Sequence, residues 1–190
     1  MFDTFEYPIL KNMPDIKVNL LWHGFVEEHV SGFFKKKTKY RAVLPDYDMC
    51  CVYEMLDGTT GIIDSKIDLF GDYDNFPFVN VDKDDKSGNS VDGETITVNG
   101  NKLSEFNKIV IYARISDWSD NWNKTDSKII CKFGSNLSEE IIMNEFEETD
   151  NIYGIISIIL NDGYYEFSPV NKFYPDSQSL IDDFGINYKR

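Results

Sequence analysis

Residues 82–94 combine oxygen ligands with glycine in a pattern that could bind a hard metal cation. The segment places five carboxylates, one Asn and two Gly within thirteen residues. Calcium takes about six to eight oxygen ligands, and glycine lets a loop fold back so that several side chains converge on one ion. The spacing is not that of an EF-hand, because Lys86, Ser87 and Gly93 stand where that motif requires Asp or Asn, Gly and Glu. A solvated acidic loop is the alternative interpretation.

A second group of acids lies at the start of a predicted strand. Asp46 and Asp48 are two residues apart, so in a strand both side chains project from the same face. Strand-end solvation explains Asp46 and Asp48 equally well. Asp117 and Asp120 follow another predicted strand and offer a third acidic group. Carboxylates packed together repel one another, and a divalent cation offsets that cost. We therefore predict a calcium site, with ligands drawn from Asp46, Asp48, Asp84, Asp85, Asp92, Glu94 and Asp117.

Signals for catalysis are weak. The sequence lacks a nucleophile elbow, a phosphate-binding Gly-Lys loop and a zinc-protease helix motif, and neither His23 nor His29 has a nearby Ser or Cys that suggests a catalytic pair. We therefore expect no enzymatic activity, with a carboxylate-pair enzyme as the weakest alternative. Trp118 and Trp122 could stack on a sugar ring in a calcium-dependent carbohydrate-binding module, or they could close one end of the core.

One basic segment and three cysteines complete the candidate functional residues. Residues 33–41 hold four Lys and one Arg beside aromatic residues, which fits either an anionic membrane or protein surface or a solvated hairpin loop. Cys50 and Cys51 are adjacent, so a strand would point them to opposite faces, and Cys131 is distant in sequence. We expect structural thiols in a reducing compartment, with a redox role as the alternative.

Composition narrows the class of protein. The 190 residues include 33 Asp and Glu against 19 Lys and Arg, a formal net charge of −14, with 15% aromatic residues. This balance excludes a uniformly basic nucleic-acid surface and supplies enough apolar residues for one folded domain, which we place at 16–190 after a lead-in at 1–15. No apolar run is long enough to span a bilayer, and the first residues do not resemble a secretory signal. We expect a soluble cytoplasmic protein.

Alternating apolar and polar residues, broken by turn dipeptides, predict a mainly β fold. A Ser cap with acidic residues makes 138–146 ambiguous between helix and strand, and a helix is clear only near 177–184, before Gly185. About eight to ten short strands and one C-terminal helix favour a β-sandwich of two antiparallel sheets. The expected strands span 16–20, 46–55, 61–67, 76–81, 95–98, 108–116, 129–133, 152–160 and 164–167.

The order of several short motifs resembles the tellurium-resistance TerD superfamily, closest to its TerA-like branch. The resemblance covers roughly 16–188. It rests on Asn-Leu-Leu-Trp at 19–22, Gly-Phe-Phe at 32–34, Asp-Tyr-Asp at 46–48, the segment 87–94, Ile-Ser-Asp at 115–117 and the tail 180–186.

The resemblance implies a calcium-binding β-sandwich without known catalytic activity. Such a protein acts in tellurite resistance and stress responses, with protein partners that can include membrane-embedded ones. The family's Asp-x-Asp motif corresponds to Asp46 and Asp48, and its acidic Gly-rich loop to the stretch ending at Glu94. Here that loop has fewer glycines and contains Lys83 and Lys86, which leaves the number of bound ions open. The family also favours a strand at 138–146. The leading hypothesis is a non-enzymatic calcium-binding stress-response module whose ion-ordered loops shape a partner-binding surface.

Overall fold

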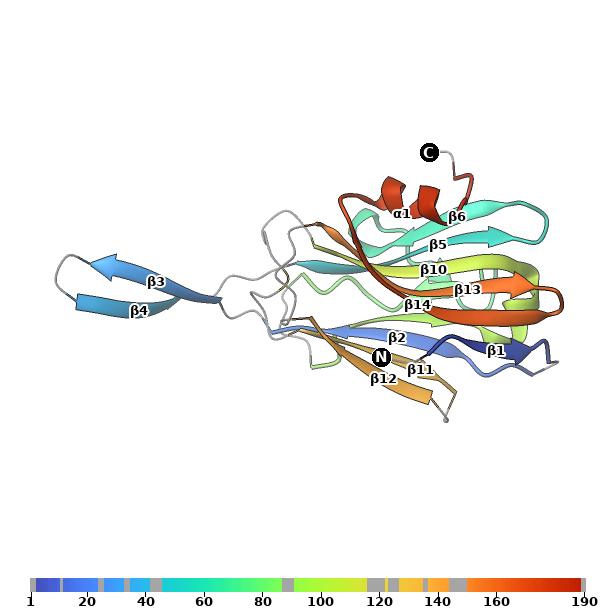
Figure 1. Ribbon diagram of the computed structural model, residues 1–190, viewed down its shortest axis with the longest axis horizontal. Helices are drawn as coiled ribbons and strands as arrows, with labels where there is room; N and C mark the ends of the chain where they lie inside the picture. The colour runs from blue at the N-terminus through green and yellow to red at the C-terminus, as the bar shows by residue number, and fades with distance from the viewer. Residues whose placement is uncertain are drawn as a thin grey trace.

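The computed structural model describes residues 3–10, 12–23, 26–32, 35–41, 46–86, 91–115, 122, 127–134, 137–143 and 150–188. Two six-stranded antiparallel sheets pack face to face and form a β-sandwich (Figure 1). The first sheet, here sheet A, has the strand order β1 (Phe5–Pro8), β14 (Tyr164–Tyr174), β13 (Ile152–Asn161), β10 (Phe106–Ile115), β5 (Tyr47–Met55) and β6 (Thr60–Asp64).

The second sheet, sheet B, has the order β12 (Leu137–Ile142), β11 (Lys128–Phe133), β2 (Ile16–Leu21), β9 (Glu94–Val98), β8 (Val79–Val81) and β7 (Gly71–Asp72). A separate antiparallel pair comprises β3 (Val26–Gly32) and β4 (Lys35–Arg41). Short 3₁₀ helices lie at Ser65–Ile67 and Gly100–Glu105, and the single described α-helix is α1 (Ser177–Asp183).

Strand β5 borders a hydrophobic core on each face, because its alternate side chains point in opposite directions. Met49 and Cys51 lie in the main core between the sheets. Cys50 and Val52 lie in a second core on the other face of sheet A, where Leu180 and Ile181 of α1 also pack. The helix begins after Asp176, whose side chain accepts a hydrogen bond from the Ser179 N–H at 2.7 Å. Each face of β5 is therefore fixed by packing.

The predicted fold class is confirmed: the chain is a mainly β sandwich of two antiparallel sheets with one short C-terminal helix. The ambiguous segment 138–146 begins as strand β12, paired with β11. The strand expected at 76–81 begins only at Val79, because Pro77 has no N–H to donate to a neighbouring strand. Within the predicted lead-in, Phe5–Pro8 pairs with β14, so these residues extend sheet A.

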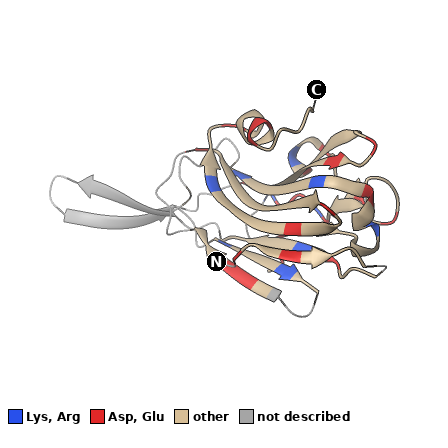
Figure 2. Cartoon of the chain, turned by 45° about the vertical axis from the view of Figure 1, so that its right-hand side comes forward, with Lys and Arg blue, Asp and Glu red and all other residues tan. Residues whose placement is uncertain are grey.

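Charged residues are spread over both sheets and α1, with Lys and Arg scattered among the more numerous Asp and Glu (Figure 2). Among the described residues, no helix has the length and hydrophobicity of a membrane span. The basic segment predicted at 33–41 overlaps β4, which pairs antiparallel with β3.

Candidate metal centre

The candidate site lies at one end of the sandwich, where elements of both sheets meet. Asp46 precedes β5, and Asp48 is the second residue of that strand. Asp84 follows β8 in the acidic loop, and Glu94 is the first residue of β9. Antiparallel pairing within sheet A also brings Arg114 of β10 opposite Asp48 and ends β6 at Asp64. Residues distant in sequence thus converge at this end.

Three of these acids form a cluster that could hold a metal ion. One carboxylate oxygen from each of Asp46, Asp48 and Asp84 lies within 4.8 Å of the others. Asp48 is fully buried and the other two are partly buried. Asp46 Oδ1 and Asp84 Oδ1 are inaccessible to solvent, and neither has a hydrogen-bond partner. Buried polar oxygens without a partner are costly, so the cluster has an unmet need for a donor or a cation.

Glu94 connects the acidic loop to sheet A through a fully buried carboxylate. Its Oε2 accepts a hydrogen bond from the Met49 N–H at 2.9 Å, and its Oε1 accepts one from the Asp85 N–H at 2.8 Å. The Ser65 hydroxyl lies 3.3 Å from Glu94 Oε2 and 3.4 Å from Asp48 Oδ1. This carboxylate therefore fixes the loop against the start of β5 and places Asp84 beside Asp48.

Arg114 offsets part of the negative charge at the site. Its guanidinium makes two hydrogen bonds to Asp64, at 2.7 and 2.8 Å, and its Nη2 also lies 3.2 Å from Asp48 Oδ2. The two-point contact matches the planar fork of arginine to a carboxylate. Arg114 therefore occupies one side of Asp48, and the same cation also pairs with Asp64.

Asp46 and Glu94 are held in an environment that disfavours their charge. Burial, with further contributions from Asp48 and Asp84, raises the pKa of Asp46 to about 6. Burial also raises the pKa of Glu94 to about 8, although its hydrogen bonds from Met49 and Asp85 oppose the shift. A nearby cation would favour the ionised forms of both groups. The donor set consists of carboxylate oxygens, which suit hard cations such as calcium or magnesium.

The chain resembles known proteins both in sequence and in fold. No family model matches the sequence. The tellurium resistance protein TerA of Alcaligenes sp is 24% identical over 180 residues, which cover 94% of this chain and 52% of TerA. The chain therefore spans about half the length of that curated relative. Two solved structures share its fold: SAV2460, a protein of unknown function, and SCO6318 of Streptomyces coelicolor A3(2), described as a homologue of the telluride resistance protein TerD.

The SAV2460 match has a TM-score of 0.64 at 14% identity and covers 90% of this chain and 95% of that one. The SCO6318 match has a TM-score of 0.62 at 12% identity, with the same coverage of both chains. The chain is therefore similar in sequence to TerA, and it shares its fold with a homologue of TerD. The resemblance predicted from the sequence motifs is confirmed.

The structure separates the predicted ligands into groups. Asp46, Asp48 and Asp84 come together. Asp85 is 9% exposed and contributes its N–H to Glu94. Asp92 is exposed, and its carbonyl accepts a hydrogen bond from the Asn19 side chain at 2.7 Å. Asp117 lies outside the described residues.

Gly93 explains why Asp92 and Glu94, two residues apart, differ so much in burial. It has a φ of +61°, a left-handed conformation that interrupts the alternation of side chains along an extended strand. A Cβ at this position would overlap the carbonyl oxygen of Leu20, so the loop approaches β2 closely. Glu94 consequently enters the interior while Asp92 remains outside.

Sequence patterns did not reveal Asp64, Ser65 or Arg114 as members of this site. Arg114 lies in a β-branched stretch that reads as an ordinary core strand, and its partners depend on the pairing of three strands. The available signal was an arginine that follows the apolar run from Ile109 to Ala113. Its role becomes visible only once Asp48 is known to lie opposite.

The tryptophan proposed as a sugar platform is part of the core. Trp122 is fully buried, its Nε1–H donates to the Asp150 carbonyl at 2.8 Å, and its ring stacks on Tyr47 with centroids 5.4 Å apart. It closes this end of the sandwich and offers no open ring face to a sugar. Trp118 lies outside the described residues.

The three thiols are all free and buried. Cys50 and Cys51 face opposite cores, as the adjacent positions predicted. Burial raises the pKa of the Cys131 thiol to about 12 and raises the pKa values of Cys50 and Cys51 well above their usual range. Thiols in this state are poor nucleophiles, which agrees with a structural role.

Proposed function

We propose that this TerD-like chain is a non-enzymatic calcium-binding module of tellurium resistance and stress response. In this proposal Asp46, Asp48 and Asp84 hold the ion, and the bound ion orders the loop from Asp82 to Glu94. The ordered loop then shapes a surface for protein partners. The connection to tellurium resistance comes from the name of the TerA protein, of which this chain spans about half.

The observation that supports the proposal most directly is the pair of buried oxygens without partners. Asp46 Oδ1 and Asp84 Oδ1 belong to the same three-residue cluster, and each lacks a hydrogen bond. A calcium ion would satisfy both oxygens at once and would offset the repulsion among the three carboxylates. The fit is chemical as well as spatial, because all three side chains supply hard oxygen ligands.

The three acidic ligands come from differently structured segments of the chain, which favours calcium over magnesium. One acid precedes a strand, one lies within it and one belongs to a loop. Magnesium requires a near-ideal octahedron at about 2.1 Å, whereas calcium accepts variable coordination at about 2.3–2.6 Å and a larger number of ligands. Waters and loop carbonyls would complete the shell around a calcium ion.

The bound cation would also attach the acidic loop to sheet A at a second point and so restrict its motion. Asp84 lies near the start of the loop, whereas Asp46 and Asp48 belong to sheet A. Binding therefore joins the loop to the sheet at a second point, beside the contact already made by Glu94. A partner that recognises the ordered loop would not have to supply its ordering free energy, on the order of 1 kcal/mol per fixed residue.

Calorimetric titration of calcium into chelator-treated protein tests this proposal. We expect one saturable binding event, lost or weakened at least about tenfold in Asp46→Asn and Asp84→Asn, because each removes a charged ligand. Asp92→Asn is the matched control, since it removes the same charge from an exposed position of the same loop. Absence of binding heat at millimolar calcium, or equal weakening by all three variants, would contradict the assignment.

A further inference from the structure

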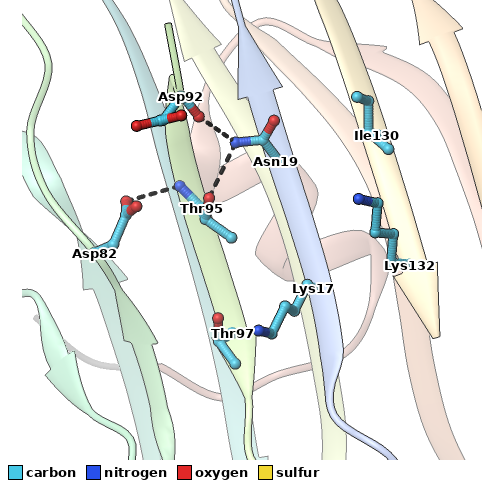
Figure 3. Close-up of a pocket in the computed structure, with 8 residues that line it drawn as sticks. All are labelled: Lys17, Asn19, Asp82, Asp92, Thr95, Thr97, Ile130 and Lys132. Carbon is cyan, nitrogen blue, oxygen red and sulfur yellow. Dashed lines mark hydrogen bonds between the residues drawn. The ribbon is translucent and has the colours of Figure 1, made fainter. Parts of the chain in front are cut away.

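A polar cavity lies on the outer face of sheet B, separate from the acidic cluster. It has a volume of about 410 Å³, and its floor is built by outward-facing side chains of β2, β9 and β11 (Figure 3). Lys17 and Asn19 come from β2, Thr95 from β9 and Lys132 from β11. These three strands are internal to the sheet, so a ligand here would meet side chains rather than free strand edges.

One end of the cavity is cationic. Lys17 and Lys132 are direct cross-strand partners, with Thr97 paired to Lys17 on the other side. Like charges placed directly opposite each other destabilise a sheet. Both lysines are exposed, and across the described part of the chain neither forms an ion pair. This pair therefore places two positive charges in neighbouring strands of a chain that has 33 acidic and 19 basic residues.

The other end of the cavity is acidic. Asp82 Oδ1 accepts a hydrogen bond from the Thr95 N–H at 2.8 Å, so its carboxylate lies beside the Thr95–Asn19 row. The Asn19 amide donates to the Asp92 carbonyl at 2.7 Å and lies 3.0 Å from Thr95 Oγ1. Asp82 and Asp92 are both exposed. Figure 3 shows these acids on the opposite side of the cavity from Lys132.

The rows of lining residues are spaced like alternate residues of an extended peptide. The row that contains Lys17 and the row that contains Asn19 are two residues apart along β2, which corresponds to about 7 Å. In an extended peptide, side chains two residues apart project from the same face at this same spacing. Seven of the eight lining residues have polar or charged side chains, the exception being Ile130, whereas pockets that enclose small cofactors are mostly apolar.

We propose that this cavity binds a partner's extended segment with one acidic and one basic side chain two residues apart. The acidic side chain meets Lys17 and Lys132, and the basic side chain meets Asp82 and Asp92. The inference deepens the proposed function by giving the chemistry of its partner. Asp82 and Asp92 lie in the loop that contains Asp84 and Glu94, each two residues from one of them, so the cavity and the candidate metal centre share one backbone segment.

A titration with short blocked peptides, followed by amide chemical shifts, tests the proposal on the full chain. The probe is acetyl-Glu-Gly-Lys-amide, and the charge controls are acetyl-Glu-Gly-Glu-amide and acetyl-Lys-Gly-Lys-amide. We expect saturable shifts at the Asn19, Thr95 and Thr97 amides with the first peptide, at lower concentration than with either control. Equal responses to all three peptides, or shifts centred elsewhere, would overturn the proposal.

Substitutions of Lys17 and Lys132 test whether peptide affinity depends on their charge. Lys17→Ala or Lys132→Ala should weaken binding about two- to fivefold, the range expected for an exposed ion pair. Lys128→Ala is the matched control, because Lys128 lies on the same face of β11 but pairs with Glu140 at 3.1 Å and does not line the cavity. The double change Lys17→Glu with Lys132→Glu should reverse the preference toward Lys-Gly-Lys. A double variant that folds but keeps the original preference would refute the assignment.

Performing each titration in chelator and in calcium separates the two proposals. Peptide binding that persists while calcium produces no binding heat supports the cavity and refutes the metal site. Calcium binding without any peptide response supports the metal site and refutes the cavity.

Discussion

At the scale of single residues, the buried acids differ in how their charge is offset. Asp48 and Asp64 share Arg114, whereas Glu94 relies on two backbone N–H groups and one hydroxyl. Backbone donors stabilise a carboxylate, yet they do not neutralise it. The raised pKa values of Asp46 and Glu94 are the expected result of burying acids near other acids.

These shifts predict that the metal-free protein loses stability as the pH rises. An unfolded glutamate ionises near pH 4.5 and the folded Glu94 near 8, so its contribution is complete below 4.5 and is lost as the pH rises through 8. Asp46 adds a loss between 3.8 and about 6. We expect the free energy of unfolding in urea to fall by on the order of 2–4 kcal/mol between pH 5.5 and 8.5 in chelator. Glu94→Gln should flatten this profile, and an unchanged slope in that variant would assign the effect to other groups.

Arg114 gives a second prediction at the same scale. Arg114→Ala leaves Asp48 and Asp64 buried without their cation, and breaking such a pair costs about 3 kcal/mol. Thermal and urea unfolding measure the loss. Arg114→Lys keeps the charge but not the two-point contact, so we expect an intermediate stability. A fully stable alanine variant would show that other groups balance the charge of the two aspartates.

At the scale of elements, β5 links the two cores to the candidate metal centre. Its first residues supply Asp48 and the N–H of Met49, and its next residues place one cysteine in each core. Substitutions near the start of β5 should therefore affect ion binding, whereas substitutions at its cysteines should affect core packing. Cys51 and Cys131 both belong to the core between the sheets, although they come from different sheets.

The structural role of the thiols predicts loss of stability without loss of ion binding. Cys51→Ser places a hydroxyl in an apolar core and should cost about 1–3 kcal/mol, while the Asp46, Asp48 and Asp84 cluster keeps its ligands. Denaturant unfolding and calcium calorimetry on the same variant measure both effects. Cys51→Ala is the matched control, because it removes the sulfur without adding a polar group. If the serine variant kept its stability but lost tellurite protection in cells, a redox role would replace the structural one.

Sequence patterns predicted most strands of the two sheets, but β1, β7 and the β3–β4 pair were not among the expected strands, and the site was predicted only in part. Turn dipeptides and alternation defined the β5–β6 hairpin and β13–β14, because local chemistry determines such features. The spacing of Asp46 and Asp48 and the composition of the acidic loop also pointed to residues that lie together in the candidate cluster. The roles of Asp64 and Arg114 depend on strand register, which long-range packing sets. The outward placement of Asp92 depends on the backbone turn at Gly93, and a simple period-two pattern does not reveal it.

At the scale of the whole molecule, the acidic loop connects two faces of the sandwich. Its inner side chains, Asp84 and Glu94, meet sheet A at the candidate metal centre. Its outer residues, Asp82 and Asp92, border the cavity on sheet B. A cation bound on the inner side would therefore restrict the same backbone that forms one wall of the cavity.

This connection predicts a local and measurable effect of calcium on dynamics. Calcium at 100 times its dissociation constant should stabilise the fold by about 2.7 kcal/mol, and the melting temperature should rise accordingly. Hydrogen exchange should slow most at the Asp85 and Thr95 amides, because their hydrogen bonds to Glu94 and Asp82 hold the loop in place. The Gly163 amide, in the hairpin turn between β13 and β14, is the control and should be unaffected.

Uniform protection across the chain would mean that calcium stabilises the global fold without ordering the loop, and unchanged protection everywhere would argue against binding at this site. The selective pattern is expected because the ion contributes a new contact between the loop and sheet A, and the nearest hydrogen bonds open only when that contact breaks.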